Sequence, residues 1–382
     1  MKAKTIVLIV ALAVIIGAIY YLESLTVSTP TLAISPVEEK LTAIPNISAE
    51  KTSEVPKPIQ PPFKAGKYPL APELAGISGY INTPPGTKIS DFRGKVVLVD
   101  FWTYTCINCL RTLPFLTDWD TKYREKGLVI IGVHSPEFEF EKKIENVLLA
   151  VEQYGIRYPV VQDNDHVTWA AYQNRFWPHK YLIDAEGYIR YDHIGEGAYA
   201  ETEKRIQELL TEIHSEVKDM NVSSLPDETP RVRTTPELYA GYAYALPRGE
   251  NIGNPEGLKP GEIVDYTLNQ ELQRDVLHLQ GKWKSNPDHL EAQGRASVFL
   301  DFTAAVVNIV AAAPEQVTLD VLVNGEPIAR DQAGSDVRFE GQHALVVIQQ
   351  PRLYQVVKGP YGHYVLELRA EKGFTFNAFT FG

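Results

Sequence analysis

Both cysteines of this 382-residue chain lie in one tetrapeptide, Cys106-Ile107-Asn108-Cys109, directly after an apolar run at residues 96–101. This order predicts a strand that leads into a helix, with the first sulfur exposed at the helix N-terminus and the second sulfur one turn further on. The positive end of the helix dipole stabilises the thiolate of Cys106, and a thiolate is the attacking species in disulfide exchange. The pair therefore indicates a redox-active dithiol.

Two other uses of the cysteine pair stay open. A Zn site would need a second pair of ligands, and the sequence has no further cysteine and no H-x(3–5)-H pair. A purely structural disulfide is the second alternative, although so short a loop restrains the unfolded chain little. We expect neither a metal nor a bound cofactor.

Charge and length limit the kind of protein. The net charge is -11, with 48 acidic against 37 basic residues, and the basic residues form no cluster. Nucleic-acid binding needs patches of Lys and Arg that neutralise phosphates, so we expect no nucleic-acid partner. The length predicts two domains, each large enough to bury its own core.

The first residues predict a membrane anchor. Lys2 and Lys4 precede an uncharged run at residues 5–22, and Glu23 follows it. As a helix this run spans roughly 27 Å, close to the ~30 Å hydrocarbon core, and its basic flank favours a cytoplasmic N-terminus. We therefore expect a single transmembrane helix at residues 1–25 and an extracytoplasmic remainder. A cleaved signal peptide is the alternative, but the run is long for one and no clear A-x-A site follows.

Composition and periodicity divide the remainder into four segments. Residues 26–70 are polar and rich in proline, which predicts a disordered linker. Residues 71–215 alternate strands with amphipathic helices, which predicts an α/β domain with a mixed sheet flanked by helices. Residues 216–235 form a second linker. Residues 236–382 have period 2 without a long helical pattern, which predicts an all-β sandwich of jelly-roll type built from about eight short strands.

The individual elements follow from hydrophobic periodicity. In the α/β segment we predict strands at 96–101, 128–133, 159–161, 180–183 and 188–193, and helices at 110–124, around 144–151 and around 206–213. In the β segment we predict strands at 296–302, 317–323, 344–348 and 364–368, with a hairpin turn at Asn324-Gly325.

Asp100 is the candidate for proton transfer. It lies within the apolar run that precedes the cysteines. A carboxyl buried there would have a raised pKa and could exchange a proton with Cys109. An Asp that points to solvent at the end of a strand is the alternative.

Trp177 and Pro178 are the candidate substrate-binding residues. Pro178 precedes a predicted strand and is the best candidate for a cis peptide bond, although cis bonds are only about 5–6% of X–Pro bonds. A cis bond would turn the carbonyl of Trp177 toward an incoming substrate backbone. His134 and Glu137 follow another predicted strand, where they either face the dithiol or are ordinary loop residues. Three further histidines, His166, His179 and His193, show no metal-ligand spacing.

These motifs resemble the thioredoxin superfamily. The segment Val99-Asp100-Phe101-Trp102, the Cys106/Cys109 pair and Pro114 match its strand, dithiol and helix-proline spacing. The chain is more similar still to the extracytoplasmic part of the DipZ family, on residues 101–114, 132–138, 163–165, 177–184 and 195–197. This resemblance runs from about Ala71 to Gly382. The C-terminal part looks like the β domain of that family, which is similar to carbohydrate-binding modules.

The resemblance implies a thioredoxin fold with cis-Pro178, an attacking Cys106, a resolving Cys109 and a buried acid at Asp100. Thr105 departs from the tryptophan that many thioredoxins carry just before the first cysteine. DipZ proteins also carry a multi-spanning electron-conducting domain, whereas this chain has one hydrophobic segment. We therefore expect a membrane-anchored thiol-disulfide oxidoreductase of the cell envelope. It would reduce disulfide-bearing envelope proteins with electrons from a separate membrane protein of the CcdA type.

Two other functions stay open. Thr103 stands three residues before Cys106, as in the T-x-x-C motif of peroxiredoxins, but Val99 occupies the position where that motif has a proline. A peroxiredoxin-like thiol peroxidase is therefore one alternative. The other is a binding protein whose β domain holds a glycan or a partner, with a secondary redox site. Its candidate stacking residues are Trp283, Tyr354 and Tyr361, which at strand spacing are more often core residues.

Overall fold

The computed structural model describes residues 64, 66–213, 217, 220–268 and 271–382. The anchor predicted at residues 1–25 and most of the linker predicted at 26–70 lie outside this part of the chain. Within the described residues, no helix is both long enough and apolar enough to cross a membrane.

A six-stranded mixed sheet forms the first half of the described chain, in the order β1-β4-β3-β2-β5-β6. β2 and β4 run parallel to β3, whereas β1, β5 and β6 pair antiparallel with their neighbours. This arrangement confirms the predicted thioredoxin-like α/β sheet and places β2, which leads to the dithiol, between β3 and β5. The strands are β1 Gly79–Ile81, β2 Val96–Trp102, β3 Leu128–His134, β4 Val160–Gln162, β5 His179–Ile183 and β6 Ile189–Ile194.

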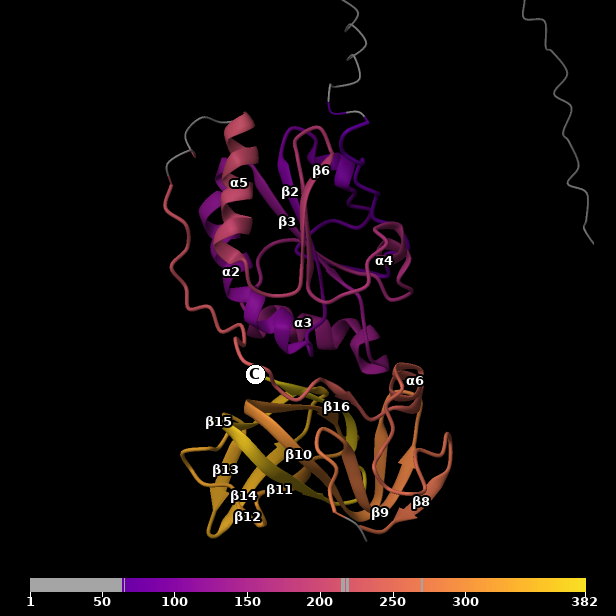
Figure 1. The fold of residues 1–382 in the computed structure, drawn as a ribbon. Coiled ribbons are helices and arrows are strands. Elements are labelled where there is room, and N and C mark those ends of the chain that lie inside the picture. The colour runs from indigo at the N-terminus through magenta and orange to yellow at the C-terminus, as the bar shows by residue number, and fades with distance from the viewer. Residues whose placement is uncertain (1–63, 65, 214–216, 218–219, 269–270) are drawn as a thin grey trace, which may run out of the picture. The chain divides into compact units, whose positions relative to one another are not determined.

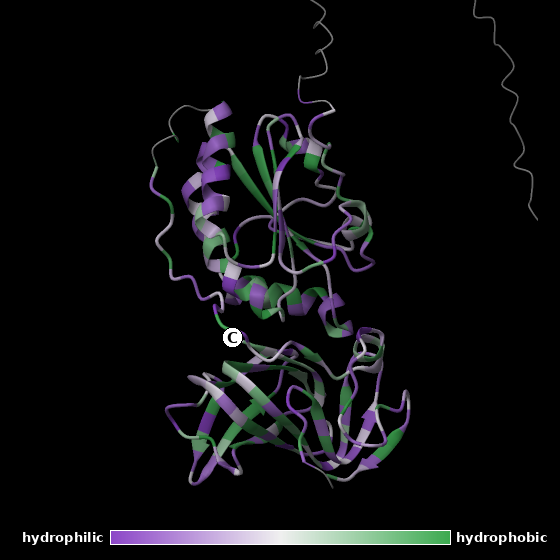
Figure 2. Cartoon of the chain, in the orientation of Figure 1, coloured by the Kyte–Doolittle hydropathy of each residue, from purple (hydrophilic) through white to green (hydrophobic). Residues whose placement is uncertain are grey.

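Helices cover both faces of this sheet (Figure 1). β2 supplies a core on each face because its side chains alternate: Leu98 and Trp102 join one apolar cluster, and Val99 and Phe101 join the other. The first cluster includes side chains of α2 Ile107–Tyr123, α3 Ile144–Gln153 and α5 Tyr199–Ile213, and the second lies against η1 Ile89–Phe92 and α4 Val167–Ala171. In Figure 2 the strands of the sheet are largely hydrophobic, while α5 carries a hydrophilic stripe.

The sequence placed most of these elements to within a few residues. α2 begins at Ile107, earlier than the predicted 110, because Cys106 itself is the N-cap. β1 and α4 were not predicted, since each is too short to show a period. Leu148, which lies within the helix predicted around 144–151, is exposed. The short turns η2 Arg124–Lys126 and η3 Glu139–Lys142 complete this half.

The second half is a ten-stranded antiparallel sheet, in which β13-β14-β11-β15-β10-β16-β7 form the main path. β12 pairs with β11, and β9 and β8 continue outward from β10. The strands enclose one apolar core. They are β7 Leu238–Tyr239, β8 Ile263–Tyr266, β9 Leu277–Ser285, β10 Leu290–Ala312, β11 Val317–Val323, β12 Glu326–Pro327, β13 Val337–Glu340, β14 His343–Ile348, β15 Arg352–Ala370 and β16 Thr375–Phe381, with the helical turns α6 Tyr242–Ala245 and η5 Leu246–Arg248.

This sheet differs from the predicted set of about eight short strands. β10 and β15 are long and pair with each other almost throughout, with register shifts near Ala304 and Val307. Irregularities of this kind bend a strand without ending it, so only a short part of each long strand was predicted, residues 296–302 of β10 and residues 364–368 of β15. All ten strands therefore belong to one hydrogen-bonded sheet.

The aromatic residues proposed for sugar stacking lie mostly in the core. Trp283 and Tyr354 are buried, so neither offers a ring face to a ligand. Tyr361 is exposed, and its hydroxyl donates to the carbonyl of Arg233 at 2.7 Å. Stacking on sugars at Trp283 or Tyr354 is therefore incompatible with this fold.

Candidate dithiol active site

The two sulfurs occupy different environments at the start of α2. Cys106 is the N-cap residue, and the backbone N–H of Cys109 donates to its Sγ at 3.4 Å. Cys106 is half-buried, whereas Cys109 is only 1% exposed, and both are free thiols. An incoming disulfide can therefore reach Cys106 and not Cys109.

Asp100 lies behind the dithiol, buried on β2 as predicted. Burial raises the pKa of this carboxyl to about 7, although the charge of Lys180 acts in the opposite direction. Burial, together with Cys106 and Asp100, also raises the pKa of the Cys109 thiol well above its usual range. A carboxyl with a pKa near neutrality can accept and return a proton at physiological pH, which is what a buried thiol needs in order to react.

A buried carboxylate holds the loop that leads to Cys106. Glu141 accepts hydrogen bonds from the hydroxyls of Thr103 and Thr105, each at 2.5 Å, and from the backbone N–H groups of Glu137 and Phe138. The carboxylate is fully buried, so these donors replace its hydration. It thus ties the loop before α2 to the loop after β3.

His134 lies behind this loop and does not line the cavity over Cys106. Its Nε2 is 3.3 Å from the hydroxyl of Thr103, and its ring stacks on Tyr104 with 5.6 Å between centroids. Burial lowers the pKa of His134 to about 3, so the ring is neutral at physiological pH. Neither prediction for His134 is right, because it is the buried last residue of β3 and not a loop residue.

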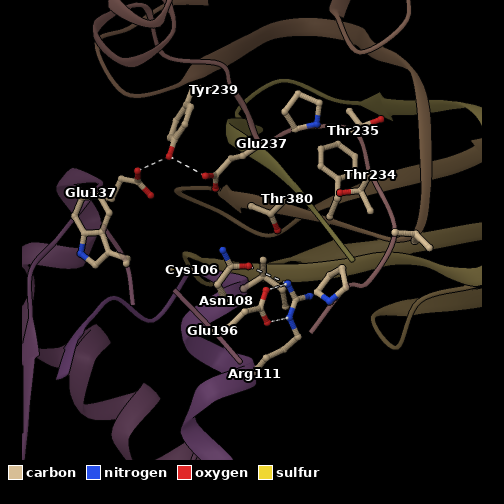
Figure 3. A pocket seen from close by; sticks show the side chains of 16 residues that line it. Cys106, Asn108, Arg111, Glu137, Glu196, Thr234, Thr235, Glu237, Tyr239 and Thr380 are labelled. Atoms are coloured by element: carbon tan, nitrogen blue, oxygen red, sulfur yellow. Dashed lines mark hydrogen bonds and ion pairs between the residues drawn. The ribbon is translucent and has the colours of Figure 1, made fainter. Parts of the chain in front are cut away.

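A pocket of about 340 Å³ opens over Cys106, lined by residues of both halves of the described chain. Figure 3 shows its side chains. On one side Arg111 forms an ion pair with Glu196, with Nε–Oε2 at 2.7 Å and Nη2–Oε1 at 2.9 Å, and also donates to Asn108. The thioredoxin-like half adds Cys106, Ile107, Glu137 and Trp177, and the remainder of the wall is Pro230, Val232, Thr234, Thr235, Pro236, Glu237, Tyr239, Thr380 and Phe381.

Glu137, Tyr239 and Glu237 form a cluster at the opposite wall (Figure 3). The hydroxyl of Tyr239 lies 2.5 Å from Oε1 of Glu137 and 3.1 Å from Oε2 of Glu237. A hydroxyl has one hydrogen, so both contacts are hydrogen bonds only when one of the carboxyls carries a proton. Burial and the neighbouring charge of Glu237 raise the pKa of Glu137, in keeping with such a shared proton.

The structure brings together most of the residues singled out in the sequence. Trp177 lines the pocket, and its indole N–H donates to the carbonyl of Ser135 at 3.0 Å. The Trp177–Pro178 peptide bond is cis, as expected. His166, His179 and His193 do not converge, and no group of three or more His, Cys, Asp or Glu side chains suited to a metal occurs among the described residues.

Sequence reasoning missed the pocket residues Arg111, Glu196 and Glu237. It also missed Lys180, Glu141 and Tyr239. Lys180 is buried in β5. The sequence did carry a signal for it, namely a lysine inside a predicted strand. The sequence contains no local signal for Glu141 or Tyr239, because their roles depend on contacts with distant segments.

Two family models match the chain. Residues 82–192 match the AhpC/TSA family, and residues 235–382 match a family described as thioredoxin like C-terminal domain. Among curated relatives, Protein DipZ of Mycobacterium tuberculosis is 37% identical over 318 residues, which is 82% of this chain and 43% of that protein. The chain thus spans less than half of that relative.

Smaller relatives match the thioredoxin-like half. Thiol-disulfide oxidoreductase YkuV of Bacillus subtilis is 27% identical over 37% of this chain and 94% of its own length. Thiol-disulfide oxidoreductase ResA of Bacillus thuringiensis is 29% identical over 33% of this chain and 68% of its own length. The thioredoxin-like half is thus similar to thiol-disulfide oxidoreductases and carries a C-x-x-C pair at a helix N-terminus.

Proposed function

We propose that this protein is a thiol-disulfide oxidoreductase that is anchored in the cell membrane by residues 1–25 and keeps the thiols of extracytoplasmic envelope proteins reduced. Its electrons would come from a separate membrane donor of the CcdA type. The observation that carries the chemistry is the unequal exposure of the sulfurs: Cys106 lines an open pocket, and Cys109 is enclosed behind it.

The residues support a two-step exchange. The thiolate of Cys106 attacks a substrate disulfide, which gives a mixed disulfide and releases one substrate thiolate. Cys109 then passes its proton to Asp100 and attacks Sγ of Cys106, which releases the second substrate thiol. Two electrons leave the enzyme, which ends as the Cys106–Cys109 disulfide and must be reduced again by its donor.

The environment of Cys109 does not make the dithiol a strong oxidant. Dithiols become strong oxidants when the protein stabilises their thiolate form, because that stabilises the reduced state. Here burial raises the pKa of Cys109, so Cys109 supplies no stabilised thiolate. We expect equilibration in glutathione buffers to place the dithiol at the reducing end of the range of roughly -270 to -120 mV that such proteins span. A value at the oxidising end would reverse the proposed direction.

Substitution of each cysteine in turn tests the roles of the two sulfurs. Cys109→Ala should trap substrate proteins as mixed disulfides on Cys106, because no second thiol remains to resolve them. Cys106→Ala should trap almost none, since Cys109 is buried. Any adduct must sit on the single remaining sulfur, because the chain has no third cysteine. Non-reducing gels of envelope extracts would show the adducts, and equal trapping by both variants would contradict the assignment.

The AhpC/TSA match favours a second candidate function, a thiol peroxidase. The motif residue for that reaction, Thr103, is buried, and its hydroxyl donates to Glu141. Peroxide turnover by the Cys109→Ala variant, which retains only Cys106, would support the peroxidase over the reductant.

A further inference from the structure

Two carboxyls from opposite halves of the described chain face the pocket over Cys106. Glu137 follows β3 in the thioredoxin-like half, and Glu237 directly precedes β7 in the β half. We call this pair the acidic wall, and Figure 3 shows it on the side of the pocket opposite Arg111. The hydroxyl of Tyr239 bridges the pair, so each carboxyl directs one oxygen to Tyr239.

Each carboxyl of the acidic wall keeps a second oxygen for another donor. Oε2 of Glu137 and Oε1 of Glu237 accept no hydrogen bond and form no ion pair within the part of the chain that the structure describes. Glu137 is only 7% exposed, so little water reaches its carboxylate. A carboxylate held in such a place costs stability unless a donor reaches it. The pocket is the open route by which a donor on a substrate can do so.

The charges around the pocket favour a positively charged ligand. Glu196 on the opposite wall is neutralised by its ion pair with Arg111. Behind the acidic wall, Arg248 lies over the ring of Tyr239 and Glu250 accepts from the backbone N–H of Tyr239, so two opposite charges offset each other there. One negative charge therefore remains at the pocket even when the acidic wall holds one shared proton.

Holding the two halves together does not require a second carboxyl. The hydrogen bond from Tyr239 to Glu137 already joins them. Two carboxyls side by side repel each other when both are ionised, and a neutral residue at position 237 would avoid that cost. Glu237 is exposed, so its side chain contributes little to the core. A role toward a ligand explains the second charge, and a role in the junction does not.

We propose that the acidic wall determines substrate specificity by binding the side chain of a lysine or arginine that stands next to the cysteine attacked by Cys106. The ammonium or guanidinium donates to the free oxygens of Glu137 and Glu237 and takes the place of their shared proton. An extended chain advances roughly 3.3 Å per residue, so a pocket of about 340 Å³ holds the substrate cysteine and its nearest neighbours only. The inference rests on the proposed function and names its substrate class: disulfide-bearing segments with a basic residue beside the cysteine.

Three short peptides of the form X-Cys-X, with X as Lys, Gln or Glu, can test this specificity. Each would carry its cysteine as a mixed disulfide with nitrothiobenzoate. The thiolate of Cys106 attacks the peptide sulfur, the S–S bond of the probe breaks, and the coloured nitrothiobenzoate leaves with the bonding electron pair. Stopped-flow absorbance follows this release from the reduced full-length protein at rising peptide concentration. Rates with 2-mercaptoethanol correct for the intrinsic reactivity of each peptide.

At pH 8 and low salt, we expect the wild type to react with the Lys peptide about tenfold faster than with the Glu peptide, with the Gln peptide between them. About 0.5 M salt should reduce the difference, because salt screens the charges. The preference should lie in the half-saturating peptide concentration and leave the limiting rate unchanged, since the basic group takes no part in the bond exchange.

Substitutions at the exposed Glu237 identify the source of the preference. Glu237→Gln should lower it to about threefold, because half of the charge that meets the basic group is gone. Glu237→Lys should abolish it, because the new ammonium then occupies the acidic wall from within the chain. Glu315→Gln, at an exposed position of the β half that does not line the pocket, is the matched control and should behave like the wild type.

Two results would overturn the inference while leaving the proposed function intact. The first is equal corrected rates for the three peptides on the wild type. The second is a preference that Glu237→Gln and Glu237→Lys leave unchanged, because the acidic wall would then not be its source. A wild type that releases no nitrothiobenzoate from any peptide would overturn the proposed function on which the inference rests, so the two failures are distinguishable.

Discussion

The carboxyl of Asp100 shows how a single residue can trade stability for chemistry. Its pKa is about 7 in the folded protein, against an ordinary value of 3.8. The folded state therefore holds this proton more tightly than the unfolded chain does. As pH rises from about 4 to about 7, the unfolded chain gives up the proton first, and the folded state loses stability relative to it.

Asp100→Asn should accordingly stabilise the reduced protein at pH 8 and change little at pH 4, where Asp100 is protonated in both states. The gain at pH 8 is at most about 4 kcal/mol, from about three pH units at roughly 1.4 kcal/mol each. Urea unfolding at the two pH values measures it. Asp331→Asn, at an exposed position of the β half, is the matched control and should stay within about 0.5 kcal/mol at both. An equal effect of Asp100→Asn at pH 4 and pH 8 would exclude this account.

At the scale of elements, η3 holds the loop between β2 and α2 in place through the side chain of Glu141. The carboxylate of Glu141 accepts hydrogen bonds from two hydroxyls of that loop and from two backbone N–H groups of the loop after β3. An amide cannot accept with both of its ends. The geometry of the loop before Cys106 therefore depends on a carboxylate that lies far from it in sequence.

Glu141→Gln should lower the free energy of unfolding by about 2 kcal/mol, because part of this charge-assisted network is lost. Chemical denaturation of the reduced protein measures the change. Glu139→Gln in the same turn is the control. Its side chain is exposed and, among the residues that the structure describes, forms an ion pair with Lys142 alone, so we expect about 0.5 kcal/mol or less. Equal losses in the two variants would mean that Glu141 has no special role.

At the scale of the whole described chain, the loop after β3 joins the thioredoxin-like half to the β half. Phe138 lies in the apolar core of the β half. The hydroxyl of Tyr244 donates to the carbonyl of Glu137, and the backbone N–H of Glu139 donates to Asp288 at 3.2 Å. Tyr239 completes the junction through Glu137. The pocket over Cys106 therefore depends on the β half for one of its walls.

Tyr239→Phe should loosen this junction. The substitution leaves the buried carboxyl of Glu137 without the hydroxyl, at a cost of about 1–3 kcal/mol. We expect a lower midpoint of thermal unfolding and faster proteolytic cleavage within residues 220–236. Tyr242→Phe is the control, since the half-buried Tyr242 makes no side-chain hydrogen bond within the described chain. The proposed junction would be contradicted if both variants behaved like the wild type.

The sequence by itself determined the features that depend on local order. The position of Cys106-Ile107-Asn108-Cys109 after an apolar run was enough to place a dithiol at a helix N-terminus, because strand, cap and helix are contiguous. The nearly continuous apolar run along β2 was enough to predict a buried strand, and it favoured a buried Asp100. Periods of 2 and 3.6 separated the β half from the α/β half.

Only the tertiary structure decided which distant residues meet at the site. Lys180 faces Asp100 because β5 pairs with β2 in one register, and a shift by one residue would turn the lysine to the other face of the sheet. Glu141 reaches Thr105, and Tyr239 reaches Glu137, across connections that no local pattern encodes. Local periodicity reports which face of an element is apolar, but the partner of each buried polar group is fixed only when the elements pack.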